Sequence, residues 1–482
     1  MGEMGPMSED MMVRDLLALA PEAALAIAAV VGLLLGSFLP RRRQWVVRLI
    51  AAAGALGVVA TTVSAWSDTA RTLFDGSYGV DSATNTVRLV VAVSLWLLLA
   101  MSVPETRGAA RESEFIVLLV LSGLGAILLA GAEDLLVLIV AYLLASIPLY
   151  ALVGFGKDGL GTEAALKYYL MGALFGTTMV FGAAIVYGAG GATAYPALLS
   201  TVHAAPKAAL VVGAVAVLGG LLFKAGAVPA QFWIPDVVAG TRTPVAALVT
   251  TVPKLGAVVA IYRLAAMVLD PSGLNWRLLI AIIATATMIL GNFAAFFQTD
   301  VRRLLGYSTI SQIGYLLVGV VALGRSDLAL PGVLIYLAAY ALTNLGAFAV
   351  VCALPTLRTI DDYAGLLRRH PGLVVSLIVC LLGLIGTPPT GVFVGKLTVF
   401  TAAFDAGYGW LVVVAVVNAV ASVFYYLRWI VPTLPGTAHG DGDAEAGSIN
   451  SWVAYIAAAA SVAVGIVAGP IMDAIQGPLA MP

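Results

Sequence analysis

Charged residues are scarce in this sequence. Only 11% of its 482 residues are Asp, Glu, Lys or Arg, against about 25% in an ordinary soluble domain. The 25 lysines and arginines nearly balance the 26 aspartates and glutamates, so no basic face is available to neutralise the phosphates of a nucleic acid. With 61% hydrophobic residues, this composition excludes a water-soluble protein and argues against nucleic-acid binding.

Soft ligands for metals and redox centres are also rare. The two cysteines, Cys352 and Cys380, lie far apart inside apolar runs, so they form neither a CxxC redox motif nor an iron–sulfur site. Three histidines complete the set. We therefore expect no metal or cofactor in this chain, and any electron chemistry must take place elsewhere.

What the sequence has in abundance is long apolar runs. Runs of about 20 residues are long enough to cross the hydrocarbon core of a bilayer as helices. The sequence predicts an all-α polytopic membrane protein with about 14 such spans. They lie at 14–38, 44–66, 85–104, 114–131, 134–155, 163–189, 207–236, 242–269, 276–298, 302–323, 328–353, 371–404, 409–432 and 451–475.

Basic residues in the loops predict the orientation. Most lie in alternate loops, beginning with Arg41, Arg42 and Arg43, and the positive-inside rule makes that side cytoplasmic. With an even number of spans, both termini lie on the outer side of a bacterial plasma membrane. The same arginines replace the small-residue cleavage site that a signal peptide would need after the first run. The last cytoplasmic loop, 435–450, is acidic and predicts a flexible linker.

Two runs contain helix breakers near their centres. The seventh carries Pro229 and the twelfth carries Pro388 and Pro389, and each predicts two half-helices around an unwound segment. Broken helices at corresponding places in two halves are typical of inverted-repeat transporters, although proline kinks alone are common in membrane helices. The predicted units are a three-helix segment (1–113), two five-helix repeats (114–269 and 270–432, with broken helices 207–236 and 371–404) and a C-terminal part with the acidic loop and last helix (433–482).

Four of the six lysines fall inside apolar runs, namely Lys167, Lys224, Lys254 and Lys396. An ionisable residue in the membrane is costly and therefore indicates function. Unlike arginine, a lysine removed from water can exchange its proton near neutral pH. Lys224, Lys254 and Lys396 lie too deep to reach an interface, whereas Lys167 is one turn from the start of its run and snorkelling explains it equally well. Arg263, near a helix end, is expected to snorkel.

No carboxylate occurs at the same depth, so the titratable groups along the membrane centre are lysines alone. Polar residues that could link them through water or hydrogen bonds include Tyr142, Gln231, Gln312 and Tyr315. Ordinary interhelical hydrogen bonding explains such residues as well.

Several segments carry a family resemblance. FKAGAVPAQFWIPD (223–236), TPVAALVTTVPKLGAVVAIYRL (243–264), DVRRLLGYSTISQIGYLLVG (300–319), GTPPTGVFVGK (386–396) and YYLR (425–428) resemble the antiporter-like membrane subunits of respiratory complex I, the proton-pumping NADH:quinone oxidoreductase. The superfamily also contains cation/proton antiporter complexes and membrane-bound hydrogenases.

The resemblance implies roles for the four lysines. Lys224 corresponds to the lysine of the first half-channel, Lys254 to the central relay, Lys396 to the second half-channel and Lys167 to the lysine of the sixth helix. It further implies that the chain moves protons within the membrane arm of an NADH-quinone oxidoreductase. Neighbouring subunits would handle NADH and quinone, and this chain would perform no redox catalysis.

The sequence departs from the family at three positions. Leu143 stands where the fifth helix usually carries a glutamate that pairs with the lysine of the seventh, and Gln231 and Gln312 stand where histidines are frequent. Two alternatives therefore remain open: a structural subunit of the same arm with degenerate conduction, and a subunit of a cation/proton antiporter complex.

Overall fold

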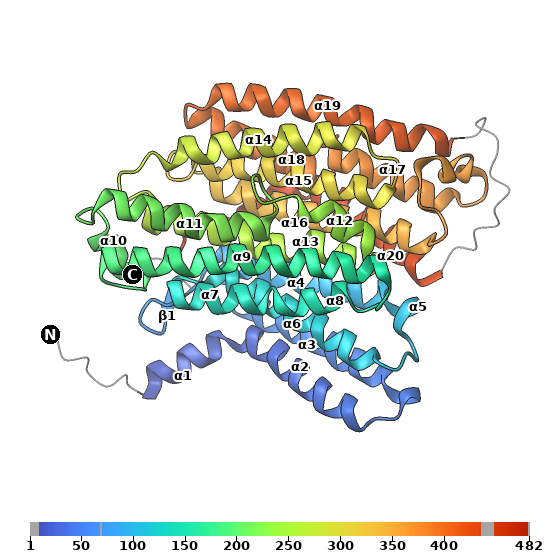
Figure 1. The fold of residues 1–482 in the computed structure, drawn as a ribbon, viewed down its shortest axis with the longest axis horizontal. Helices are drawn as coiled ribbons and strands as arrows, with labels where there is room; N and C mark the ends of the chain where they lie inside the picture. The colour runs from blue at the N-terminus through green and yellow to red at the C-terminus, as the bar shows by residue number, and fades with distance from the viewer. Residues whose placement is uncertain (1–8, 68–69, 435–447, 481–482) are drawn as a thin grey trace.

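The chain forms a bundle of helices in the computed structural model, which describes residues 9–67, 70–434 and 448–480. Within these residues, 13 helices are long and apolar enough to cross a membrane. Figure 1 shows the helices packed side by side, from α2 and α3 at one edge of the molecule to α14 and α19 at the opposite edge. The prediction of an all-α polytopic membrane protein is confirmed.

The elements follow one another along the chain with short connections. In the first part they are α1 (Glu9–Ala18), α2 (Ala20–Phe38), η1 (Arg41–Arg43), α3 (Trp45–Ser64), β1 (Arg71–Leu73), β2 (Tyr78–Val80), α4 (Ser82–Met101), α5 (Val103–Thr106), α6 (Glu112–Gly131), α7 (Leu135–Leu144), α8 (Ile147–Val153), α9 (Gly159–Gly190), α10 (Tyr195–Thr201), α11 (Lys207–Ala225), α12 (Trp233–Gly240) and α13 (Thr243–Leu264). In the second part they are η2 (Ala265–Leu269), α14 (Trp276–Phe296), α15 (Val301–Val321), α16 (Ala329–Ala353), η3 (Ile360–Tyr363), η4 (Leu366–Arg368), α17 (Pro371–Ile385), α18 (Gly391–Asp405), α19 (Gly409–Thr433), α20 (Ser448–Ile466) and α21 (Ala468–Ile475).

Both predicted helix breaks are present, between α11 and α12 and between α17 and α18. The first helix of each pair ends in a glycine with left-handed backbone, Gly226 (φ 88°) and Gly386 (φ 93°), a conformation that glycine adopts without a Cβ penalty. Both endings use the same hydrogen bonds: the amides of Gly226 and Ala227 donate to the Leu222 carbonyl, and those of Gly386 and Thr387 donate to the Leu382 carbonyl. The two breaks therefore share one local geometry.

A third break was not predicted. The fifth span divides at Ala145 and Ser146, between α7 and α8. Pro148 follows in the first turn of α8. Because proline has no N–H and its ring clashes with the carbonyl four residues earlier, a continuous helix could not run through this point.

Smaller differences occur at the ends of the chain. The first span begins at α2, after a separate α1, and the last span divides into α20 and α21. The antiparallel hairpin of β1 and β2 was not predicted either. Of the predicted acidic linker, residues 435–447 lie outside the described part of the chain.

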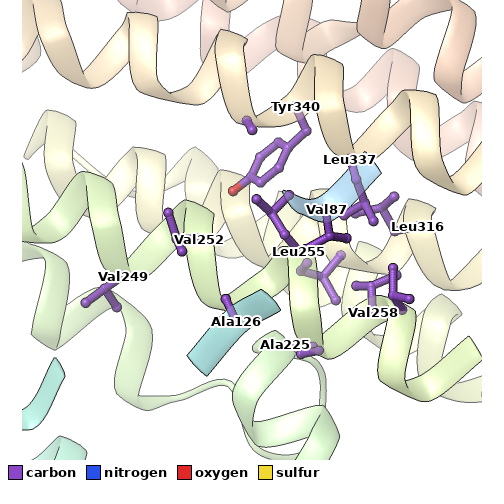
Figure 2. Packing of buried hydrophobic residues seen from close by; sticks show 14 of the residues in the cluster. Val87, Ala126, Ala225, Val249, Val252, Leu255, Val258, Leu316, Leu337 and Tyr340 are labelled. Carbon is purple, nitrogen blue, oxygen red and sulfur yellow. The ribbon is translucent and has the colours of Figure 1, made fainter. Parts of the chain in front are cut away.

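Helix α13 lies at the centre of the bundle. Its apolar span is completely buried, and it contacts α4, α6, α11, α12, α15 and α16. Figure 2 shows Leu255 and Val258 of α13 packed beside Val87, Leu316 and Leu337 of its neighbours. Lys254 is therefore surrounded by protein rather than by lipid.

Gly256 allows α13 to approach α6 closely, which yields a stability prediction. A Cβ on Gly256 would overlap the backbone carbonyl of Ala126, whereas a Cβ on Gly219 of α11 would meet only a ring carbon of Phe175 at 3.9 Å. We expect Gly256→Ala to destabilise the protein by about 1–3 kcal/mol, the usual cost of overpacking. The matched control, Gly219→Ala, should leave the thermal unfolding midpoint unchanged or raise it, because alanine is the better helix former. Equal midpoints for the two variants would contradict the close packing.

Candidate proton-transfer site

The side chains of Lys224, Lys254 and Lys396 are buried inside the bundle, with exposed fractions of 1%, 0% and 4%. Their ammonium groups point to the C-terminal ends of helices. Lys254 Nζ donates to the carbonyl of Lys224, in the last turn of α11, at 3.3 Å. Lys396 Nζ donates to the carbonyls of Leu384 (2.9 Å) and Ile385 (2.8 Å), in the last turn of α17.

The unpredicted break provides the same kind of partner for Lys224. Lys224 Nζ donates to the carbonyl of Ala145, the C-cap residue of α7, at 3.2 Å, and to the hydroxyl of Ser146. The last carbonyls of a helix have no partner within it and carry about half a negative charge in total. Each buried ammonium is therefore compensated by helix-end carbonyls. Within the described residues, none of the three lysines forms a salt bridge.

An aromatic ring covers each of these ammonium groups. Lys224 Nζ lies 4.9 Å from the ring centre of Tyr142, and Lys254 Nζ lies 4.7 Å from that of Trp233. Lys396 Nζ lies 4.3 Å from the ring centre of Tyr315. Such contacts stabilise a desolvated cation by about 2 kcal/mol. The predicted residues Tyr142 and Tyr315 therefore lie against buried lysines.

Leu143 faces away from Lys224. Its side chain is 44% exposed on the outside of the bundle, whereas Tyr142 and Ser146, four residues apart, face inward to the lysine. A hydrogen bond from the Ser146 hydroxyl to the Tyr142 carbonyl (2.6 Å) joins these two residues across the break. A carboxylate at position 143 would thus point out of this chain, and the ring of Tyr142 and the hydroxyl of Ser146 contact Lys224 instead.

Hydrogen bonds extend from α13 to the second half of the chain. Asn344 Nδ2 on α16 donates to the hydroxyls of Thr250 (3.1 Å) and Thr251 (2.9 Å). The hydroxyl of Tyr340 donates to the Thr250 carbonyl (2.8 Å) and to the hydroxyl of Thr309 on α15 (3.1 Å). These residues form a polar connection between α13 and α15 inside an otherwise apolar core.

Gln312 lies one turn after Thr309 on α15 and forms hydrogen bonds of its own. Its Nε2 donates to the Leu384 carbonyl at 2.8 Å, the same carbonyl that accepts from Lys396. Its Oε1 accepts from the Tyr336 hydroxyl at 2.5 Å. The predicted position of Gln312 in the polar interior agrees with these contacts.

The remaining predicted residues lie apart from this connection. Gln231 lies in the unwound segment before α12, with its Oε1 buried and without a hydrogen-bond partner in the described structure. Lys167 lies near one end of the bundle with its side chain 46% exposed, and it pairs with Glu163 (2.8 Å) and Asp236 (2.9 Å). The structure does not bring Lys167 to the three buried lysines.

The expectation that Arg263 snorkels is wrong. Its guanidinium is fully buried and forms ion pairs with Asp81 (2.7 Å) and with Glu133. Burial raises the pKa of Glu133, and Arg263 partly opposes that shift. The segments before α4 and before α7 bring these carboxylates to Arg263 from distant parts of the sequence. Because they compensate the charge of the guanidinium inside the protein, the side chain does not extend to the interface.

The sequence analysis missed three contributors, which are Tyr336 and Tyr340 on α16 and Thr309 on α15. Tyr336, Tyr340 and Asn344 follow one another at intervals of four residues, which places them on one face of α16. That spacing could have indicated a polar face on α16. No comparable pattern in the sequence marks Thr309 on α15. Among the described residues, no three His, Cys, Asp or Glu side chains gather as metal ligands would.

Comparison with known proteins identifies the family. A family model described as NADH:quinone oxidoreductase/Mrp antiporter, TM, matches residues 132–422. The chain belongs to this family. The matched region contains all three buried lysines and both predicted helix breaks.

The relatives of this antiporter-family chain match over nearly its full length. NADH-quinone oxidoreductase subunit N of Mycobacterium sp. (strain JLS) is 49% identical and covers 96% of this chain and 99% of its own. NADH-quinone oxidoreductase subunit N 1 of Streptomyces griseus is 51% identical and covers 96% and 98%. The resemblance to the antiporter-like membrane subunits of complex I is thus confirmed.

Solved structures share the fold. A chain of respiratory complex I from Thermus thermophilus with bound aureothin is 28% identical, with a TM-score of 0.80 over 95% of this chain and 100% of that chain. A chain of the Mrp complex from Dietzia sp. DQ12-45-1b has a TM-score of 0.82 over 97% of each chain at 20% identity. At that identity the second match supports the fold alone.

The pairing of Arg263 yields a second prediction. Arg263→Met leaves Asp81 and Glu133 buried without their cation, and removal of one partner of a buried pair costs about 3–5 kcal/mol. We expect a much lower thermal unfolding midpoint and reduced assembly. Lys167→Met, which removes an exposed ion-paired lysine, should change the midpoint little. Equal effects would contradict a stabilising role for the buried pair.

Proposed function

We propose that this chain is subunit N of a complex-I-type NADH-quinone oxidoreductase and moves protons along its buried lysines. The single observation that carries the proposal is the pairing of Lys224, Lys254 and Lys396 with helix-end carbonyls. Mid-membrane lysines are too costly to be retained without a function. Two relatives named as subunit N, from Mycobacterium sp. and Streptomyces griseus, match over almost their full length.

Carbonyl partners suit a group that must gain and lose a proton. A buried lysine bound to a carboxylate leaves an unpaired buried anion when it deprotonates, which is strongly unfavourable. A lysine bound to carbonyls leaves only neutral groups behind. Both protonation states are therefore tolerated, and arginine could not replace lysine, because its guanidinium does not release its proton.

The proposed route runs from Lys224 through Lys254 to Lys396. The first two are close, because Lys254 donates to the backbone of Lys224 itself. Beyond Lys254, the Tyr340 hydroxyl contacts both the backbone carbonyl of Thr250 and the hydroxyl of Thr309 on α15. Hydroxyl groups can both accept and donate a proton, whereas the amides of Asn344 and Gln312 serve to orient water and hydroxyls.

The location and partners follow from the same proposal. Other subunits of the membrane arm would adjoin this chain and handle NADH and quinone. The loop arginines would face the cytoplasm and both termini the outer side of the plasma membrane. The shared geometry of the breaks at Gly226 and Gly386 supports two inverted repeats.

Two observations favour a second candidate, a structural subunit with degenerate conduction. Leu143 provides no carboxylate, and the buried Oε1 of Gln231 has no partner in the described structure. This candidate predicts that changing the lysines leaves proton pumping intact.

Lysine-to-arginine variants separate the two candidates. In the purified complex reconstituted into vesicles, we expect Lys254→Arg and Lys396→Arg to lower proton pumping per NADH oxidised several-fold, because arginine keeps the charge but does not release its proton. Lys254→Met and Lys396→Met, which remove the charge, should also lower it. The control is Lys207→Arg at the exposed start of α11, which should pump normally. Normal pumping in all four lysine variants would favour the structural subunit.

A further inference from the structure

A cleft lies at the arginine-rich end of the bundle, on the same side as α5 (right in Figure 1). A cavity of ≈ 590 Å³ opens there between the ends of α9, α12, α13, α15 and α16. A smaller cavity of ≈ 230 Å³ shares Leu160, Gly240, Arg302 and Arg358 with it. The two cavities therefore form one continuous cleft, which we call the arginine cleft.

Three guanidinium groups from separate segments line the larger cavity: Arg242 precedes α13, Arg302 lies in the first turn of α15, and Arg358 lies in the loop after α16. Asp362 holds that loop by accepting the backbone amides of Arg358 (2.9 Å) and Thr359 (2.7 Å). The loop that carries Arg358 is thus held in place.

Arg302 is the most deeply buried arginine of the cleft. It is only 8% exposed, and its guanidinium donates to the Thr241 carbonyl at 3.1 Å. Within the described residues, no carboxylate forms an ion pair with Arg302 or with Arg358. A guanidinium has five N–H donors, and a buried charge without a counterion is costly. An anion in the cleft would supply the missing partner.

The acidic residues of the cleft already have partners in the chain, either backbone amides at the start of a helix or an arginine. Asp158 accepts the Gly161 amide at 2.7 Å as the N-cap of α9, and Asp300 accepts the Arg302 amide at 2.8 Å as the N-cap of α15. Glu105 lies 4.0 Å from Arg242.

Four charged groups of the smaller cavity are paired with one another. Asp236 binds both Lys167 (2.9 Å) and Arg303 (2.8 Å), and Glu163 binds Lys167. The larger cavity is lined by three arginines and by two carboxylates, Glu105 and Asp158, so it keeps a positive excess. The N-terminus of α13 adds to it.

We propose that the arginine cleft binds the phosphate group of an anionic phospholipid. Arginine side chains bind phosphate oxygens bidentately, and basic pockets between membrane helices on the cytoplasmic side are suited to such headgroups. Free phosphate offers the same chemistry, but the cleft also has an apolar wall. Leu160, which lines both cavities, is 61% exposed at the start of α9, so acyl chains can lie along this helix.

The bound lipid would join the two halves of the chain. Arg242 belongs to the segment before α13, whereas Arg302 and Arg358 belong to the second half. A ligand that binds only the folded state stabilises it in proportion to the logarithm of its concentration. The inference does not depend on proton conduction, so its test is independent of the lysine variants.

The test uses the purified complex, stripped of bound lipid and reconstituted into nanodiscs. One set contains phosphatidylcholine alone, a second adds phosphatidylglycerol, and a third contains phosphatidylcholine with inorganic phosphate in the buffer. We expect phosphatidylglycerol to raise the thermal unfolding midpoint and native mass spectrometry to detect retained phosphatidylglycerol. Inorganic phosphate should give no comparable rise.

Variants assign the effect to the cleft. Arg358→Gln, an exposed position whose change should not disturb folding, and Arg302→Gln should both lose the rise in midpoint and the retained lipid. Arg42→Gln, at an exposed arginine on the same end of the bundle, should keep both. The proposal is overturned if Arg358→Gln responds to phosphatidylglycerol as fully as Arg42→Gln, or if inorganic phosphate reproduces the effect of the lipid.

Discussion

The contact between a buried ammonium group and the carbonyls at the end of a helix is the interaction on which this structure depends. It occurs for Lys224, Lys254 and Lys396, and each occurrence requires a helix that ends inside the bundle. The left-handed Gly226 and Gly386 and the proline at position 148 produce those ends. Without them, every backbone carbonyl at this depth would accept a hydrogen bond from an amide of its own helix. A buried lysine would then have no backbone acceptor.

The burial of α13 follows from the same constraint. A helix that carries Lys254 cannot face lipid, so protein surrounds it on all sides. Gly256 lets α6 approach closely on one side, and Thr250 provides hydrogen-bond partners for α16 on another. Figure 2 shows Tyr340, whose hydroxyl belongs to this polar connection, among apolar side chains of the core.

Two kinds of buried cation coexist in this chain and have different partners. Arg263 has a permanent charge and binds the carboxylates Asp81 and Glu133, so its ion pairs fix the arrangement of α4, α7 and α13. The three lysines bind carbonyls, which tolerate both the charged and the neutral amine. In the sequence, Leu143 at the position of the usual glutamate looks like the loss of a partner for Lys224. Carbonyl partners make this lack of a mid-membrane carboxylate consistent with lysines that exchange protons.

The sequence by itself determined the spans, the two breaks marked by Pro229 and by Pro388 and Pro389, and the depth of the three lysines, because hydropathy and proline act locally along the chain. Only the tertiary structure decided what the lysines contact. Lys224 meets a carbonyl 79 residues away and Arg263 a carboxylate 182 residues away. The rotation of each helix about its axis selects these partners, and runs this uniformly apolar carry no periodic signal that specifies the rotation. For the same reason Thr309 went unnoticed and Arg263 was wrongly placed at the interface.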